Sequence, residues 1–357
     1  MALKNRFGPA GWRVVRTCTV WVCVALGWSG AAAQENGVPT LHVYPNLVQV
    51  PALVLDDNLK PIVPIAEGRF FISLGGGPRF RVTHARLEGD EPISLAILLD
   101  VNQPYPSLMR GMDDAIAGLA PASLHVKDHV SIYSMYCKLV RTSTDVPADA
   151  SWLKGAVDLA LAEWSVGGQD RHKRDCQKLW NLWDSMSFAA NALAKQPGRR
   201  VLLVVTDGVD RGSRTSLKAL RDFAQERGVA IFGLQQPGDV NRLLPMGTPD
   251  RESSFKDLCE LTGGIVLTAD QKELAERLKW FTTLLRDRYI LEFPRPSDSE
   301  AGKVEMSVTV EKMKAFTLTA GTGIPLPDPG IMKDPTTVPL DPAGAPQLGK
   351  RKAISPN

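Results

Sequence analysis

Three short runs of apolar residues in the middle of the chain constrain its fold more than any other feature. They cover residues 93–99, 201–206 and 229–234, and aliphatic side chains dominate each of them. Runs of this length without polar alternation indicate strands buried on both faces, as in a parallel sheet covered by helices. Because segments of helical periodicity separate these runs, the sequence predicts an α/β fold with a doubly wound, Rossmann-like, mostly parallel sheet.

The helix that follows the second run has sequence signals at both ends. Leu217 and Leu220 lie on its apolar face, Ser213 is placed to cap its first turn, and Gly228 is placed to end it. Serine favours helix N-caps because its hydroxyl accepts a free backbone N–H, and glycine readily adopts the left-handed conformation that closes many helices. We therefore expect a helix between the second and third strands.

Strand-like sequence flanks the predicted α/β region on both sides. In residues 34–90 the stretch "LHVYPNLVQVPALVL" alternates, and the glycines at 75–77 separate two runs typical of a hairpin. Beyond the α/β region, residues 91–287, the stretches "YILEF", "KVEMSVTV" and "AFTLTAG" within 288–322 are again strand-like. We expect both sets to form one flanking β-rich module. Residues 323–357 are proline-rich without apolar periodicity, which predicts a disordered tail.

The first 33 residues have the features of an export signal. A basic segment precedes the apolar core "TVWVCVALGWSG", and "AAAQ" supplies small residues for a signal peptidase, so we predict cleavage after Ala33. Cleavage would leave no membrane span and a periplasmic or secreted protein; the alternative is an uncleaved N-terminal anchor. This segment holds four of the 42 Lys and Arg residues and none of the 39 acidic ones, so the mature chain has a net charge of −1. That balance argues against nucleic acid as a partner.

Three cysteines remain after the predicted cleavage: Cys137, Cys176 and Cys259. An oxidising compartment would allow one disulfide among them. The sequence leaves all three pairings open, together with the alternative of unpaired thiols, and the spacing matches no metal-binding pattern.

Two acidic residues mark the ends of predicted strands. Asp100 follows the first apolar run, and Asp207 follows the second. The carboxyl ends of parallel strands meet at one edge of the sheet, where open α/β proteins bind ligands, so we expect these two residues to lie close together. Neighbouring carboxylates repel each other unless a cation, hydrogen bonds or water offset the repulsion. This edge is therefore the candidate functional site.

The ordered set of segments resembles the von Willebrand factor A (VWFA, or VWA) domain. The strand "EPISLAILLD" and a later strand that ends in "TDG", followed by "DRGSRTSLKALRDFAQERGVAIFGL", carry this resemblance. More narrowly, "LVQVPALVLDDNLKPI", "DRYILEF" and "GKVEMSVTV" are similar to the VWFA-related proteins of acidobacteria, over residues 40–322. The resemblance implies a Rossmann-like fold and a divalent-cation site written Asp-x-Ser-x-Ser, completed by a Thr and an Asp from two further loops.

The residues at the implied cation site depart from that pattern. Asp100 and Asp207 match its first and last positions, but Asn102 and Pro104 replace the two serines, and Trp180 stands where the Thr is expected. Mg²⁺ requires a near-octahedral set of oxygen ligands, and proline and tryptophan have no side-chain oxygen. We therefore expect a degenerate site of Asp100, Asn102 and Asp207 that binds Mg²⁺ or another divalent cation weakly or not at all, and no resident cofactor.

The resemblance and the export signal together favour a non-catalytic module that binds another protein, as an adhesion or scaffolding domain. Exposed tryptophans near the edge would anchor such a partner, and buried ones would only pack the core; the candidates are Trp152, Trp164, Trp180 and Trp183. The alternative is a phosphatase-like α/β hydrolase with Asp100 as nucleophile. Asn102 stands where its general acid should be, and an amide cannot protonate a leaving group.

Overall fold

The computed structural model describes residues 44–101, 107–171, 180–237, 251–297, 301–313, 316–327, 329–333, 335, 337–338 and 342–349. The chain divides into two compact units, Met1–Leu41 and His42–Asn357. The first unit, which includes the predicted export signal, lies outside the described residues. Within the described part, no helix combines the length and apolar character needed to cross a bilayer.

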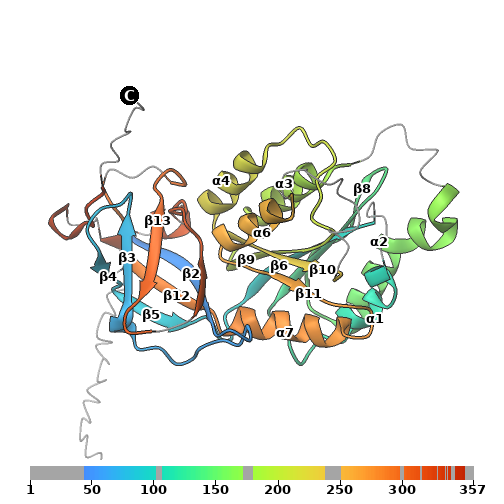
Figure 1. The fold of residues 1–357 in the computed structure, drawn as a ribbon, viewed down its shortest axis with the longest axis horizontal. Coiled ribbons are helices and arrows are strands. Elements are labelled where there is room, and N and C mark those ends of the chain that lie inside the picture. The colour runs from blue at the N-terminus through green and yellow to red at the C-terminus, as the bar shows by residue number, and fades with distance from the viewer. Residues whose placement is uncertain are drawn as a thin grey trace, which may run out of the picture. The chain divides into compact units, whose positions relative to one another are not determined.

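The second unit contains the predicted sheet, with strand order β11-β10-β9-β6-β7-β8 (Figure 1). β8 pairs antiparallel with β7, whereas the other neighbours pair in parallel. All residues of β6 and β10 are buried, as expected for strands covered on both faces. The three apolar runs thus form β6, β9 and β10, and the predicted fold class is confirmed. The strands are β6 (Ile93–Asp100), β7 (His129–Met135), β8 (Leu139–Pro147), β9 (Arg199–Val205), β10 (Val229–Gln235) and β11 (Val266–Thr268).

Helices cover both faces of this sheet, and alternate strand residues enter two separate cores (Figure 1). Leu95 and Ile97 of β6 pack in the core that contains α1, α2 and α7, whereas Ala96 and Leu98 pack in the core that contains α3, α4 and α6. This alternation follows from the two-residue period of a strand. The helices are α1 (Met112–Ala117), α2 (Ala150–Arg171), α3 (Leu182–Leu193), α4 (Leu217–Arg227), α6 (Arg251–Leu261) and α7 (Leu274–Arg286).

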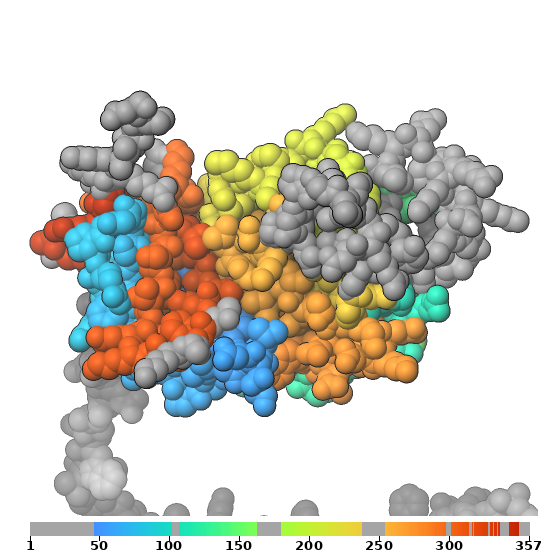
Figure 2. Space-filling model, viewed as in Figure 1, coloured from blue at the N-terminus to red at the C-terminus, as the bar shows by residue number. Residues whose placement is uncertain are grey.

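Strands from both sides of the α/β region form the predicted β-rich module. One sheet has the order β14-β2-β12-β5 and the other the order β13-β3-β4. Their apolar faces share one core, which includes Val50, Phe70 and Leu291. The late strand β13 lies beside the early strand β3 (Figure 2), and β3 pairs with β4 as the expected hairpin. The strands are β2 (Leu47–Leu55), β3 (Phe70–Leu74), β4 (Phe80–Arg81), β5 (His84–Leu87), β12 (Tyr289–Pro294), β13 (Met306–Val310) and β14 (Thr317–Ala320).

The chain remains packed beyond residue 323, where the sequence predicted the start of a disordered tail. Ile324 is completely buried, and its carbonyl accepts the Gly302 N–H at 2.8 Å. The Leu326 N–H donates to the Glu226 carbonyl at 2.7 Å. The predicted boundary was therefore too early, because prolines interrupt the apolar pattern without preventing single side chains from packing. Short elements follow, namely α8 (Pro329–Lys333) and β15 (Thr337–Val338), which pairs with β1 (Tyr44–Pro45).

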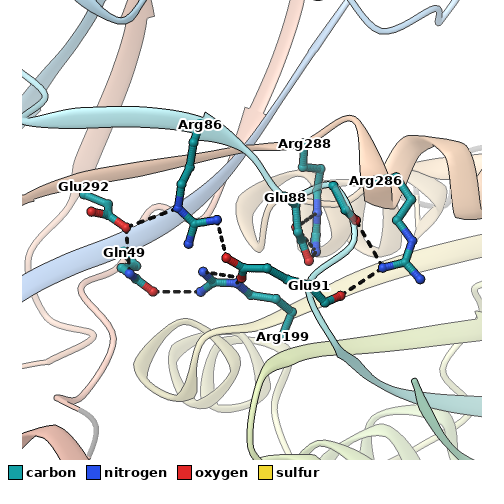
Figure 3. A network of polar contacts seen from close by, with 9 residues as sticks. Gln49, Arg86, Glu88, Glu91, Arg199, Arg286, Arg288 and Glu292 are labelled. Atoms are coloured by element: carbon teal, nitrogen blue, oxygen red, sulfur yellow. Dashed lines mark hydrogen bonds and ion pairs between the residues drawn. The ribbon is translucent and has the colours of Figure 1, made fainter. Parts of the chain in front are cut away.

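Charged and polar side chains link the strands of the β-rich module to those of the central sheet (Figure 3). Arg288, between α7 and β12, donates from Nε and Nη2 to the carboxylate of Glu88, at 2.9 Å each. Only 2% of the Arg288 side chain and 0% of the Glu88 side chain are exposed. Arg199, at the start of β9, donates to Gln49 of β2 at 2.9 Å and to Glu91 at 3.0 Å. One ion pair of this network is thus buried, and another is partly exposed.

Candidate functional site

The carboxyl ends of β6 and β9 form the point at which the strand order of the sheet reverses. These strands are neighbours, but the chain continues from β6 to β7 on one side and from β9 to β10 on the other. The loops that follow them therefore diverge, and doubly wound proteins bind ligands in the crevice left between such loops. Leu99 pairs with Val205, so Asp100 and Thr206 follow at the same level. We call this region the carboxyl edge; Asp100 and Asp207 both lie there, as the strand pattern predicted.

Asp100 is completely buried and accepts a hydrogen bond from the neighbouring strand. Thr206 Oγ1 donates to Asp100 Oδ2 at 2.6 Å, and the same hydroxyl oxygen accepts the Gly208 N–H at 3.1 Å. The Thr206 N–H donates to the carbonyl of Leu234, in β10, at 3.1 Å. Thr206 therefore ties the ends of β6, β9 and β10 together, and its hydroxyl supplies one of the donors that a buried carboxylate requires.

Asp207 is also buried and is paired with Arg211, four residues later. Arg211 Nη1 lies 3.3 Å from Asp207 Oδ1, and Nη2 donates to Oδ2. Nη1 also donates to the Val209 carbonyl at 3.0 Å, while the Val209 N–H donates to Asp207 Oδ1 at 3.0 Å. The planar guanidinium thus binds both carboxylate oxygens at once. Burial alone lowers the pKa of Arg211, but the hydrogen bond to Asp207 and the charges of Asp207, Asp100 and Asp210 raise it overall.

The turn that orients Asp207 requires glycine at the next position. Gly208 has φ +77°, a left-handed conformation that side chains disfavour. A Cβ atom at this position would lie 2.6 Å from Gln235 Nε2 and 3.1 Å from Phe255 Cδ1. The glycine of the "TDG" segment therefore lets the backbone pass close to β10 and α6.

Polar side chains brace the loop after Asp207 against the start of α3. Asp184 accepts the Thr215 N–H at 2.8 Å, and Asp210 accepts both the N–H and the hydroxyl of Ser213, at 2.9 and 2.5 Å. The prediction that Ser213 caps α4 was wrong, because Ser216 caps that helix and Ser213 serves the loop. Sequence reasoning also missed Asp184 and Asp210, although Asp210 with Ser213 three residues later is a pattern typical of such local hydrogen bonds.

Aromatic side chains lie beside this edge. The Trp180 N–H donates to the carbonyl of Tyr136, the residue after β7, at 3.0 Å. The Trp180 ring is edge-on to Phe188 of α3, with centroids 6.5 Å apart, and Phe188 in turn contacts the buried Tyr133 at 6.3 Å. The exposed fractions are 36% for Trp180 and 47% for Phe188. An aromatic pair of this kind offers apolar area to solvent.

The other tryptophans of the sequence prediction have different environments. Trp183 is buried and stacks on Phe255 at 6.3 Å. Trp152 is 61% exposed near the start of α2; that helix follows β8, whose last residue pairs with the first residue of β7 at the opposite edge of the sheet. The side chain of Trp164 lies outside the described residues. Among the described tryptophans of the sequence prediction, Trp180 is therefore the one that is exposed at the carboxyl edge.

The described cysteines restrict the disulfide pairing. Cys137 is disulfide-bonded, and Cys259 is a free, buried thiol. Two of the three pairings that the sequence left open are thereby excluded, because both involve Cys259. Burial raises the pKa of the Cys259 thiol well above its ordinary value, with a smaller contribution from Glu260, so this thiol is protonated and unreactive. Cys176 lies outside the described residues.

The described side chains at the carboxyl edge do not fit a divalent cation as they stand. Both oxygens of Asp207 face Arg211, and one oxygen of Asp100 accepts from Thr206. Within the described residues, no group of three or more His, Cys, Asp or Glu side chains is arranged to hold an ion. Asn102 and Pro104 of the predicted site lie outside those residues.

No family model matches the chain, and no curated protein matches its sequence. The sheet order and the helices on both faces define a Rossmann-like α/β architecture. The search of solved structures returned weak similarities, among them one to a vWF domain. One of the matched structures is proximal thread matrix protein 1 from the mussel byssus with zinc in its MIDAS motif, at 13% identity and TM-score 0.40, covering 59% of this chain and 49% of that chain. The present chain thus spans about half of that protein.

Two bacterial structures are similar over about half of this chain. BatB from Bacteroides thetaiotaomicron has 16% identity and TM-score 0.37, and the match covers 54% of this chain and 99% of that chain. The vWF domain of the type V pili tip protein Mfa5 from Porphyromonas gingivalis has 9% identity and TM-score 0.36, with coverage of 54% and 94%.

Proposed function

We propose that this chain is an exported, non-catalytic module that binds another protein through the carboxyl edge of its central sheet. The observation that carries the proposal is the exposed aromatic pair Trp180–Phe188 beside a loop that the partly buried Asp184 and Asp210 brace. Aromatic side chains on a rigid support are typical anchors of protein interfaces, because they bury a large area with little loss of side-chain freedom.

The contacts of Asp100 support a binding role over the hydrolase alternative. A nucleophile must reach its substrate, but Asp100 is 0% exposed, and Oδ2 is engaged by Thr206 at 2.6 Å. Asp207, the neighbouring acid, is held by Arg211 and is therefore poorly placed to donate a proton. Both carboxylates stabilise the loops in this proposal, and the loops present the binding surface.

Export is part of the same proposal. The N-terminal sequence supports it through the basic segment, the apolar core and "AAAQ". The disulfide at Cys137 is consistent with an oxidising compartment. A periplasmic or secreted protein of the VWA type with a surface aromatic pair would act outside the cytoplasm on a protein partner.

The test is a quantitative pull-down from an extract of the producing cells, with three forms of the mature protein. These are the wild type, the double variant Trp180→Ala with Phe188→Ala, and the control Trp152→Ala, which removes an exposed tryptophan from the opposite edge. We expect a set of proteins that the wild type and the control retain at equal levels and that the double variant loses at least tenfold. Equal retention by all three forms would exclude the aromatic pair as the binding surface.

A further inference from the structure

We propose that the guanidinium of Arg211 takes the place of a divalent cation at the carboxyl edge, so that the chain carries its own permanent positive charge there. The inference has a direct corollary: removing this side chain should open a site that binds a divalent cation. It concerns the side chains of the edge alone and does not depend on whether the edge binds a protein.

The guanidinium of Arg211 occupies both oxygens of the Asp207 carboxylate. Arg211 approaches Asp207 with two nitrogens, one toward each carboxylate oxygen, and is fixed by a third bond from Nη1 to the Val209 carbonyl at 3.0 Å. A carboxylate that binds a hard cation directs the same oxygen lone pairs at the metal. The Asp207 oxygens therefore cannot serve Arg211 and a metal ion in the same arrangement.

Two buried acidic residues bring negative charge to the carboxyl edge. Asp100 and Asp207 are 0% and 1% exposed, and Asp210 lies close enough to contribute to the local field. Buried like charges repel each other and require a compensating positive charge or protonation. Arg211 supplies that charge; it interacts favourably with all three acids, and the net effect raises its pKa. Because arginine stays protonated across the physiological range, the compensation does not depend on cation concentration.

Arg211 is partly exposed to solvent, unlike the carboxylate that it contacts. One third (33%) of the Arg211 side chain is exposed, whereas 1% of the Asp207 side chain is. Arg211 thus reaches solvent while its guanidinium contacts the buried Asp207 carboxylate. Truncation of this side chain would free both oxygens of Asp207 from their ion pair. The same edge holds the Asp100 carboxylate and the Thr206 hydroxyl, so the oxygen ligands there would suit Mg²⁺ or Mn²⁺.

The experiment titrates Mn²⁺ into the purified mature protein by isothermal calorimetry and repeats thermal melts in Mn²⁺ and in EDTA. The variants are Arg211→Ala, Arg211→Lys, which retains the charge, and the double variant Arg211→Ala with Asp207→Asn, which removes the main carboxylate. The matched control is Arg214→Ala, because it removes one arginine from the same loop while leaving the Asp207 ion pair intact.

We expect Mn²⁺ to bind Arg211→Ala and to raise its Tm by about 2 to 3 °C at tenfold excess over Kd. The wild type, Arg211→Lys, Arg214→Ala and the double variant should show no heat of binding and no rise in Tm. If Arg211→Ala is unfolded in EDTA, the proposal predicts that Mn²⁺ restores its folding. Wild-type binding equal to that of Arg211→Ala would overturn the proposal, and so would the failure of Mn²⁺ either to bind or to refold Arg211→Ala.

Discussion

The buried ion pair between Arg288 and Glu88 leads to a quantitative prediction. Replacement of Arg288 by methionine keeps most of the side-chain volume but leaves the Glu88 carboxylate buried without its partner. Both side chains are at most 2% exposed, and two bonds of 2.9 Å join them. Loss of one member of such a pair costs about 3–5 kcal/mol in free energy of unfolding. The Arg199–Glu91 pair provides the comparison: with 20% and 37% of its side chains exposed, Arg199→Met should cost about 1 kcal/mol or less.

A double variant separates the value of the pair from the penalty of an unpaired charge. Arg288 Nη1 has no hydrogen-bond partner among the described residues, so the pair is imperfect as it stands. Replacing Arg288 and Glu88 together by methionine removes both charges and should restore most of the stability lost in Arg288→Met, since apolar replacements of buried pairs are often neutral. The assay is urea denaturation followed by circular dichroism. Equal losses in Arg288→Met and Arg199→Met, or a double variant less stable than either single variant, would refute this reasoning.

Three further predictions concern the carboxyl edge and the N-terminus. Thr206→Val should lower the free energy of unfolding by about 1–3 kcal/mol, because buried Asp100 loses the hydrogen bond from the Thr206 hydroxyl, and Thr206→Ser should recover most of this loss in the same urea assay. Gly208→Ala should cost about 1–3 kcal/mol through its φ of +77° and its contact with Gln235, and a Tm equal to that of the wild type would show that the turn relaxes. N-terminal sequencing of the exported protein should begin at Gln34, and an intact Met1 would indicate an uncleaved anchor.

The sheet could be predicted from the sequence because its strands are buried on both faces. β6, β9 and β10 are apolar without alternation, and the segments between these strands are long enough to form helices. The positions of Asp100 and Asp207 followed from strand direction alone. Pairing of the early and late β strands was also predictable, because strand-like sequence flanks the α/β region on both sides.

The side-chain contacts of the loops at the carboxyl edge could not be predicted in the same way. An ion pair across a loop has no periodicity, so the pairing of Arg211 with Asp207 carried no signal beyond a spacing of four residues. The role of Ser213 was assigned to the wrong neighbour, because two serines precede α4 and only the folded loop shows which one caps it. Ile324 was missed for a related reason: a single apolar residue among prolines can still fill a gap in a core.

The measurement that tests the account most directly is the pull-down repeated with and without EDTA. The central claim is that the carboxyl edge binds protein through its aromatic pair, with Arg211 rather than a metal ion as its positive charge. We expect the proteins retained by the wild type and lost in Trp180→Ala with Phe188→Ala to be captured at the same level in EDTA and in millimolar Mg²⁺. Capture that disappears in EDTA, or the absence of any protein that depends on the aromatic pair, would contradict the claim.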